Sequence, residues 1–265
     1  MFAILVDVTK CTGCEKCVEA CVQAHDQDLR KAAVDRVTTK DGLSANRFCT
    51  VLQAEPGRFA RKSCMHCLEP SCVAACLVGS LTKTPEGAVV YDPAKCIGCR
   101  YCMLACPFHI PRYQWESITP FVMKCDLCID RLREGKVPAC VEACPHGALS
   151  FGERQAILDL AHLQVTQTDC NYLPRIWGEE EYGGTSVLYL SDVDLDCMGW
   201  PADESVPIPE ITEPLITRTP HIGLGVLAGL FGLKWIIDRR TLLMDGQQEA
   251  PDPEENATGE VERDE

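Results

Sequence analysis

Cys96-Ile97-Gly98-Cys99-Arg100-Tyr101-Cys102-Met103-Leu104-Ala105-Cys106-Pro107 is the stretch on which the interpretation of this chain depends. Its cysteines have the spacing C-x2-C-x2-C-x3-C, and a proline follows the last of them. The same spacing recurs once without the proline, and two looser versions occur elsewhere. Sixteen of the 19 cysteines fall into these four quartets: Cys11, Cys14, Cys17, Cys21; Cys64, Cys67, Cys72, Cys76; Cys96, Cys99, Cys102, Cys106; and Cys125, Cys128, Cys140, Cys144.

Nineteen cysteines in 265 residues are far above ordinary usage, so either disulfides or metal must explain them. Disulfide scaffolds are usually short secreted chains, whereas tight and regular C-x2-C groups hold thiolates around a metal. Three cysteines spaced by two can ligate three corners of a cubane, and the fourth cysteine of such a run ligates the neighbouring cluster. The spacing therefore predicts [4Fe-4S] clusters, with iron as the metal.

This exchange of the fourth cysteine predicts four clusters with four ligands each, so no corner stays open for a substrate. We therefore expect electron transfer, with no catalytic residue in this chain. The predicted ligand sets are set 1, Cys11, Cys14, Cys17 and Cys144; set 2, Cys64, Cys67, Cys72 and Cys106; set 3, Cys96, Cys99, Cys102 and Cys76; and set 4, Cys125, Cys128, Cys140 and Cys21. The alternative is structural zinc on two C-x2-C pairs, a form that only the fourth quartet has.

The quartets are of two kinds, since the first and third follow a strand-like run and the second and fourth precede one. Residues 81–84 and 88–91 flank the turn Pro85-Glu86-Gly87 and predict a β-hairpin between the second and third quartets. Strands at 2–8 and 148–152 are then left to pair. We expect an α+β fold over residues 1–152, in which a permuted ferredoxin-like unit (about 64–110) is inserted into another ferredoxin-like unit.

Other elements are expected along the chain. Residues 18–22 suit a short helix, 47–53 a strand, 55–58 a turn, 154–165 a helix and 186–190 a strand. The irregular remainder of 153–214 is expected to wrap the cluster domain or to contact a partner.

Residues 222–237 are apolar on every face before Lys234, and residues 215–240 are predicted to form a single transmembrane helix. Sixteen helical residues reach only ~24 Å, against roughly 30 Å of hydrocarbon. Lys234 and Trp235 at the interface can close that gap. The alternatives are a buried core helix and an amphipathic anchor.

Charge gives the expected orientation of that helix. Lys234, Arg239 and Arg240 follow its apolar part, so the positive-inside rule places the C-terminus in the cytoplasm and the cysteine domain on the periplasmic or outer face. Residues 241–265 carry nine acids and one arginine, which predicts a disordered acidic tail. The net charge of −14 argues against nucleic acid as a partner.

Several residues outside the quartets can be interpreted either as structural residues or as functional ones. The three remaining cysteines are expected to be small buried hydrophobic residues; they are Cys49, Cys170 and Cys197. His66, His109 and His146 stand beside ligands and are expected to pack or to face solvent, with tuning of a cluster as the alternative. His221 at the membrane edge marks the interface or, alternatively, a quinone site. Lys10, Lys95 and Lys124 each precede a quartet and can offset cluster charge.

The sequence resembles the four-cluster ferredoxin-like subunits of membrane respiratory oxidoreductases over nearly its whole length, in particular electron-transfer subunits of the hydrogenase-2 type and beta subunits of formate dehydrogenase. The stretches that carry the resemblance are 43–46, Cys64-Met65-His66-Cys67, 96–111, 124–128, 138–140, 183–185 and the C-terminal span.

The resemblance implies a relay of electrons from a catalytic subunit, with a nickel–iron or molybdenum/tungsten centre, to a quinone-reactive membrane subunit. Hydrogenase-2-type relays carry a twin-arginine signal, and residues 2–8 are a strand-like run with no such signal. Export together with a signal-bearing partner is therefore expected. A cytoplasm-facing complex, or a reductase of the DMSO, polysulfide or nitrite type that runs in the opposite direction, is the alternative.

Overall fold

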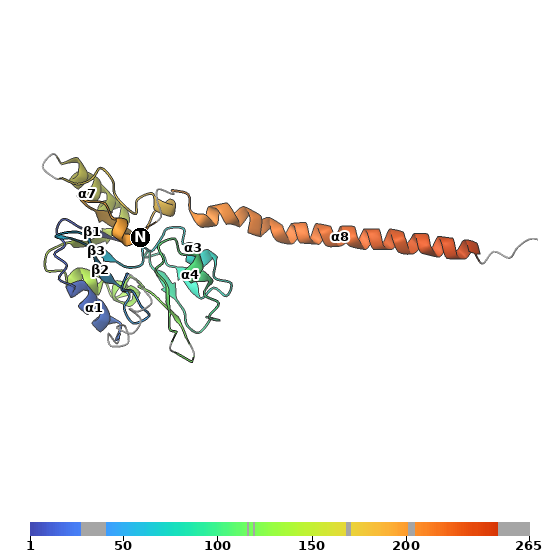
Figure 1. The fold of residues 1–265 in the computed structure, drawn as a ribbon, viewed down its shortest axis with the longest axis horizontal. Helices are drawn as coiled ribbons and strands as arrows, with labels where there is room; N and C mark the ends of the chain where they lie inside the picture. Colours follow the sequence, from blue (N-terminus) through green and yellow to red (C-terminus); the bar gives the residue numbers. More distant parts are fainter. Residues whose placement is uncertain (28–40, 116, 119, 168–170, 201–204, 249–265) are drawn as a thin grey trace, which may run out of the picture. The chain divides into compact units, whose positions relative to one another are not determined.

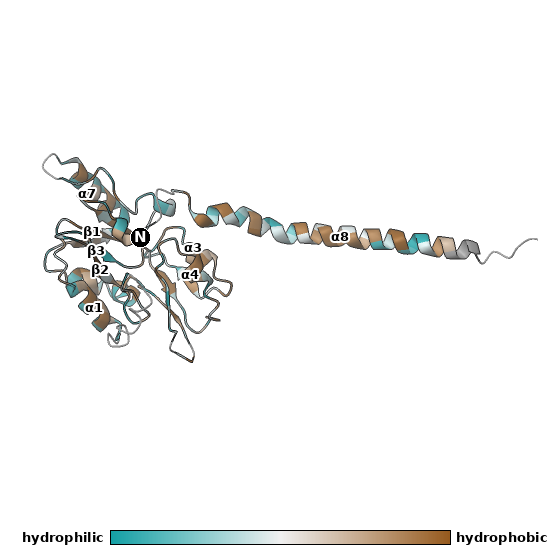
Figure 2. Ribbon diagram, viewed as in Figure 1, coloured by the Kyte–Doolittle hydropathy of each residue, from teal (hydrophilic) through white to brown (hydrophobic). Residues whose placement is uncertain are grey.

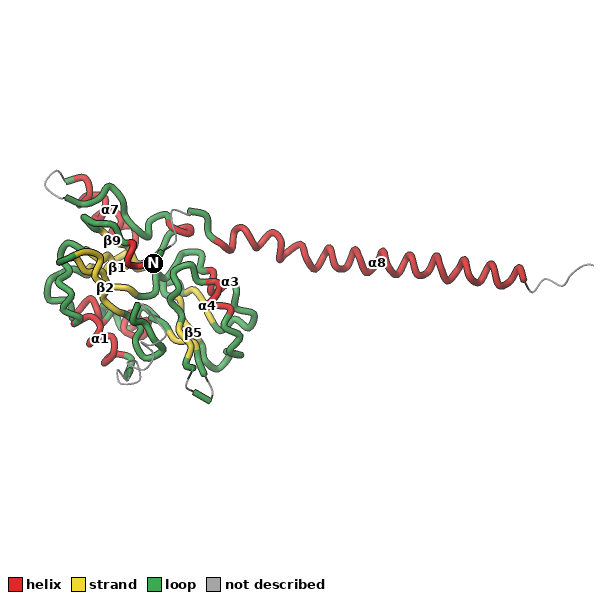
Figure 3. The backbone as a smooth tube through the Cα atoms, in the orientation of Figure 1, coloured by secondary structure: helices red, strands yellow, loops and turns green. Residues whose placement is uncertain are grey.

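The computed structural model describes residues 1–27, 41–115, 117–118, 120–167, 171–200 and 205–248, and the chain divides between Ile211 and Thr212 into two compact units. The first unit mixes short strands and short helices with long loops, as expected for an α+β protein (Figure 3). The predicted C-terminal helix belongs mostly to the second unit. Each unit is described by itself below.

The first unit contains a three-stranded sheet in the order β8-β1-β9, of which β1 is labelled in Figure 1. β1 (Phe2–Asp7) pairs antiparallel with β8 (Leu149–Glu153), so the predicted pairing of the two ends of the cysteine region is confirmed. β9 (Val187–Leu190) adds parallel to the other edge of β1. The strand expected at 186–190 is confirmed, and its position beside β1 was not predicted.

β1 is buried on both faces, which explains its continuous apolar run. Successive side chains point to opposite faces of a strand. Ala3 and Leu5 therefore pack with α7 (Arg154–Thr166), the helix expected at 154–165. Ile4 and Val6 pack instead into the larger core that contains most of the buried cysteines. β1 thus joins a plain hydrophobic layer to the cysteine-rich core.

Three hairpins shape the cysteine region. β2 (Thr50–Glu55) and β3 (Arg58–Lys62) pair across the predicted turn at Pro56-Gly57, although the strand begins three residues later than expected. β4 (Leu81–Lys83) and β5 (Val89–Tyr91) form the hairpin predicted between the second and third quartets. β6 (Arg112–Tyr113) and β7 (Val122–Met123) form a third hairpin, which was not predicted.

Short helices follow the cysteine loops. They are α1 (Lys16–Ala24), which includes the helix expected at 18–22, and α3 (Ser71–Ala74), α4 (Tyr101–Ala105), α5 (Ile129–Arg133) and α6 (Ala139–Glu142). Two single 3-10 turns, Glu181–Gly183 and Asp196–Met198, lie on either side of β9.

Left-handed backbone bends the cysteine loops into these helices. The residues that precede α1, α4 and α5, which are Glu15, Arg100 and Cys128, all have positive φ. Gly13, between the first two cysteines of its quartet, has φ +73°, and a Cβ there would lie 2.8 Å from the ring of Phe59. Only glycine fits that place without strain.

α8 (Ile208–Gln248) is longer at both ends than the anchor expected at 215–240. Among the described residues it is the one helix long and apolar enough to cross a membrane, over Ile208–Met244. Its mean hydropathy there is 1.5, and apolar residues recur along it in Figure 2. Residues 241–248, expected in the disordered tail, are helical, whereas the rest of that tail lies outside the described residues.

Asp41 joins two of the hairpins. Its carboxylate accepts hydrogen bonds from Arg112 Nη2 at 2.8 and 3.0 Å and forms an ion pair with Lys62 Nζ at 3.1 Å. All three side chains are at most 15% exposed. Burial by itself would raise the pKa of Asp41, but the two cations hold that pKa below its usual value of 3.8.

We predict that Asp41→Asn lowers the free energy of unfolding in urea by roughly 1–3 kcal/mol under anaerobic conditions. A carboxylate with a lowered folded pKa stabilises above its unfolded pKa and loses this contribution as pH falls through the folded pKa. The difference between wild type and variant should therefore be constant from about pH 8 to pH 5 and shrink below about pH 4. Glu134→Gln, in an exposed ion pair with Lys136, is the control and should change little. An equal effect of both variants would contradict the prediction.

Candidate functional site

All sixteen predicted ligands lie in the first unit, and the loops described above expose them unequally. Cys14 and Cys99, the second cysteines of the first and third quartets, are exposed. The other fourteen are buried or half-buried. Set 1 and set 3 therefore each have one ligand at the surface, whereas set 2 and set 4 have none.

The structure brings the four members of set 2 together, and likewise the four members of set 3. The β4–β5 hairpin connects the two quartets that supply them. Burial raises the pKa of the Cys67 thiol, and so do the charges of three neighbours, which are Cys64, Cys106 and Cys72. Burial also raises the pKa of Cys102 to about 11, with further contributions from Cys99, Cys96 and Cys76. Each group of neighbours is the remainder of one predicted set, including the cysteine from the other quartet.

The four cysteines of set 1 line one hollow, together with Arg61 of β3 and the backbone turn before α1. Burial raises the pKa of Cys11, as do the nearby charges of Cys144 and Cys14. The antiparallel pairing of β1 with β8 positions these loops, because Cys11 follows β1 and Cys144 precedes β8. Crowded thiols with raised pKa values keep their protons in the absence of a metal. Iron of a cluster would displace these protons and bind the thiolates.

Set 4 is formed by α1, α5 and α6. Burial raises the pKa of Cys128 to about 11, and the charge of Cys140 adds to the shift. The pKa of Cys21 is raised by its hydrogen bond with Cys49, by burial and by the charge of Cys125. All four side chains of set 4 are buried.

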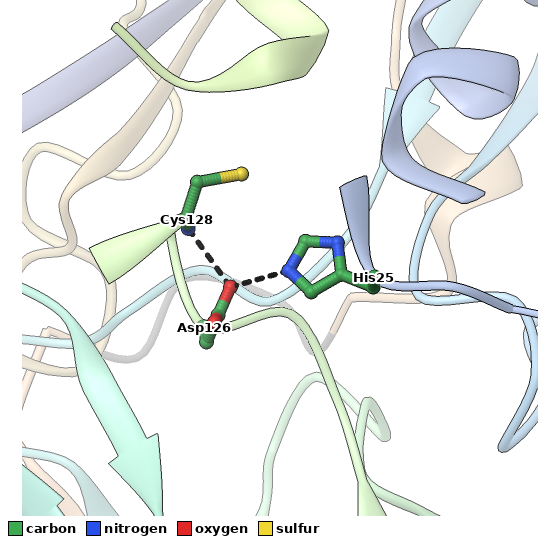
Figure 4. Close-up of side chains that lie close together, drawn as sticks. All are labelled: His25, Asp126 and Cys128. Carbon is green, nitrogen blue, oxygen red and sulfur yellow. Dashed lines mark hydrogen bonds and ion pairs between the residues drawn. The ribbon is translucent and has the colours of Figure 1, made fainter. Parts of the chain in front are cut away.

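An ion pair that was not predicted from the sequence links the end of α1 to the loop before α5 (Figure 4). His25 Nε2 lies 2.9 Å from Asp126 Oδ1, and the same oxygen accepts the backbone N–H of Cys128 at 2.8 Å. His25 Nδ1 is 2.9 Å from the carbonyl oxygen of Cys21. Burial opposes the charged imidazole, but Asp126 raises the pKa of His25 overall. We call this pair the His25–Asp126 clamp.

Together with Cys128, the clamp has the composition of a small metal site, because the nitrogen, oxygen and sulfur donors of the three residues lie within 4.8 Å of one another. The carboxylate oxygen is already occupied by the imidazole and by a backbone N–H. We therefore interpret the arrangement as a structural link between two parts of set 4.

Thiols of different sets also lie close to one another. In three pairs, the two cysteines belong to different sets. Burial raises the pKa of the first cysteine of each pair, and the charge of the second cysteine raises it further. These pairs are Cys17 with Cys140 for sets 1 and 4, Cys125 with Cys64 for sets 4 and 2, and Cys72 with Cys102 for sets 2 and 3. These interactions connect set 1 with set 4, set 4 with set 2, and set 2 with set 3.

The three lysines that precede quartets differ in environment. Lys10 and Lys95 are about half exposed, and each forms an ion pair with the aspartate three residues earlier. Lys124 is buried and donates hydrogen bonds to the carbonyl oxygens of Val89 and of Cys125. Of the three lysines, only Lys124 therefore offers a buried charge. All three precede a quartet, so this position in the sequence does not predict which one is buried.

The remaining candidates take ordinary positions. His66 is buried, and its Nδ1 accepts the backbone N–H of Val89 at 2.9 Å. Burial and nearby cations hold the pKa of His66 well below its usual range, so the ring is neutral. His109, His146 and His221 are exposed. Cys49 is buried as expected, Cys197 is only half-buried, and Cys170 lies outside the described residues.

Comparison with known proteins identifies the cysteine region. Residues 57–154 match the 4Fe-4S dicluster domain family. A protein of Nitratidesulfovibrio vulgaris is 36% identical over 94% of this chain and 70% of its own length. Hydrogenase-2 operon protein HybA of Escherichia coli O157:H7 is 32% identical over 90% of this chain and 84% of its own length.

A further relative extends the comparison to a second class of complex. The iron-sulfur subunit of nitrate-inducible formate dehydrogenase of Escherichia coli K12 is 35% identical over 71% of this chain and 67% of its own length. The expected [4Fe-4S] cofactors and the resemblance to both classes of subunit are confirmed. The chain belongs to the 4Fe-4S iron–sulfur protein family that includes hydrogenase-2 operon protein HybA and the iron-sulfur subunits of formate dehydrogenases.

Proposed function

We propose that this chain is the electron-transfer subunit of a membrane-bound respiratory oxidoreductase, with four [4Fe-4S] clusters on sets 1 to 4. The observation that carries the proposal is the grouping of sixteen cysteines into four sets of four within one unit. When bound, each cluster supplies one-electron chemistry. With four thiolates on every cluster, no position is left for a substrate.

The exposed ligands support a path through the relay. Sets 1 and 3 end the row and contain Cys14 and Cys99, the two exposed cysteines among the sixteen predicted ligands. Sets 4 and 2 lie between them, as the neighbouring thiols of different sets indicate. We therefore propose that electrons pass between the two ends through clusters 1, 4, 2 and 3.

The partners follow from the relatives and from the helix. A hydrogenase-type or formate dehydrogenase-type catalytic subunit would meet one exposed end, and a quinone-reactive membrane subunit the other. α8 would anchor the chain, with the cysteine unit outside and the C-terminus in the cytoplasm, and a signal-bearing partner would accompany export. Within residues 1–152 we propose two two-cluster units, the second permuted and inserted at about 64–110, followed by a wrapping segment up to α8.

Metal analysis tests the cluster count directly. Anaerobically purified wild type is expected to contain about sixteen irons and sixteen sulfides, and to show interacting paramagnetic clusters after reduction. Zinc at about one ion per four thiolates, with no visible colour, would contradict the proposal.

Serine variants test the exchange of the fourth ligand between quartets. Cys76→Ser should change the same paramagnetic signal as Cys96→Ser, and Cys72→Ser should change a different one, because Cys76 is assigned to set 3 and Cys72 to set 2. Cys197→Ser is the matched control and should keep all iron. If Cys76→Ser and Cys72→Ser affected the same signal, the exchange would be wrong.

The His25–Asp126 clamp is expected to slow the loss of cluster 4. His25→Gln and Asp126→Asn should each speed the bleaching of visible absorbance in denaturant, because each removes the link between Cys21 and the Cys128 loop. The double variant should bleach no faster than the faster single variant, since both break one interaction. Rate effects that multiply in the double variant would show that the two residues act separately.

The anchor is tested by an arginine in the middle of α8. Leu227→Arg should reduce membrane retention roughly 100-fold, because an arginine at the centre of a span costs about 2.5–3.5 kcal/mol. Leu243→Arg, near the end of the apolar helix, is the control and should change retention little. Flotation of membranes from cells that express the whole chain measures both. Equal retention of wild type and Leu227→Arg would exclude a spanning α8.

A further inference from the structure

Arg61 is a buried cation without a carboxylate partner among the described residues. It lies on β3 with 2% of its surface exposed. Its Nη1 donates a hydrogen bond to Ser63 Oγ at 2.8 Å, and its Nε has no partner in the part of the chain that the structure describes. By contrast, Arg58 of the same strand forms a bidentate ion pair with Asp192, in which Nε donates to Oδ1 at 2.8 Å and Nη2 to Oδ2 at 2.6 Å.

A guanidinium cannot escape this environment by losing its proton. Burial of an ion without a counter-ion is strongly unfavourable, so a folded protein supplies an anion close by. No aspartate or glutamate among the described residues takes that role for Arg61. The counter-charge must come from other groups around the side chain.

Thiols surround Arg61: those of two neighbouring sets, and Cys49, which belongs to no set and is hydrogen-bonded to the Arg61 side chain. The side chain lines the same hollow as the four cysteines of set 1. Cys125 and Cys140 of set 4 are also close to the guanidinium: burial raises their pKa values, and the charge of Arg61 lowers them in turn. The guanidinium thus lies close to thiols of both sets, which are neighbours in the row.

We propose that Arg61 is a positioning residue for electron transfer, whose fixed positive charge is shared by clusters 1 and 4 and raises the reduction potentials of both. The proposal rests on the cluster sets proposed above. A cubane with four thiolates is anionic, and one added electron makes it more so, with no bond formed or broken. A nearby cation therefore favours the reduced state of each cluster and weakens the repulsion between them.

The test is a redox titration of the whole chain, followed by electron paramagnetic resonance, with wild type, Arg61→Met, Arg61→Lys and Arg58→Met. In Arg61→Met the equilibrium constants for reduction of clusters 1 and 4 should fall about tenfold, which is ~59 mV for one electron. Clusters 2 and 3 should keep their potentials. Arg61→Lys retains the charge and should shift the potentials by less than half as much. Arg58→Met, whose ion pair is partly exposed, is the matched control and should leave all four unchanged.

Unchanged potentials in fully loaded Arg61→Met, or an equal shift of all four clusters, would overturn the proposal. If Arg61→Met does not load, wild type with 15N-labelled arginine decides the matter. Hyperfine coupling from a guanidinium nitrogen to reduced cluster 1 or 4 is then expected, and its absence would overturn the inference. Failure of the relay itself is separate, because wild type would then contain far fewer than about sixteen irons.

Discussion

The structure depends on bringing together groups that repel one another once they are charged. Burial and neighbouring thiols raise the pKa values of Cys17 and Cys72 to about 12, so these side chains lose protons only when a metal takes the protons' place. Much of the first unit is loop, and its strands are two to six residues long. Metal ligation thus contributes to folding here in the way that a larger hydrophobic core does in other domains.

The conventional core explains why the loops meet at all. β1 carries the chain into the first quartet, and β8 carries it away from the fourth, so their pairing brings Cys11 and Cys144 together. The β4–β5 hairpin does the same for the second and third quartets. A short antiparallel pair therefore joins the first quartet to the fourth, and another joins the second to the third; the His25–Asp126 clamp adds a side-chain link.

Local sequence patterns predicted the features that local physics determines. The cysteine spacing, the hairpin around Pro85-Glu86-Gly87 and the strand at 2–8 each have a signal within a few residues, and the structure contains both elements. The addition of β9 to β1 has no local signal, because the two strands are about 180 residues apart. His25 and Asp126 are separated by 101 residues, so only the fold reveals their contact.

Arg61 illustrates the same limit for charged residues. Between Phe59 and Lys62 it has the appearance of a basic residue on an exposed hairpin, as Arg58 at the start of the same strand is. Alternation along the strand does not predict its burial, because Ala60 and Lys62 on the opposite face are buried as well. The lysines beside the quartets have a clearer signal in the sequence, and of these only Lys124 is buried.

The exposure of Cys14 and Cys99 has a consequence for survival in air. A thiolate that solvent reaches is also within reach of dioxygen and peroxide, and oxidation of a ligand leads through sulfenic to irreversible sulfinic acid. In the proposed relay these two cysteines hold the terminal clusters, whereas the inner clusters have no exposed ligand. In a chain that has not yet met its partners, oxidative damage would therefore begin at the two ends, where those partners are to bind, while the middle was still intact.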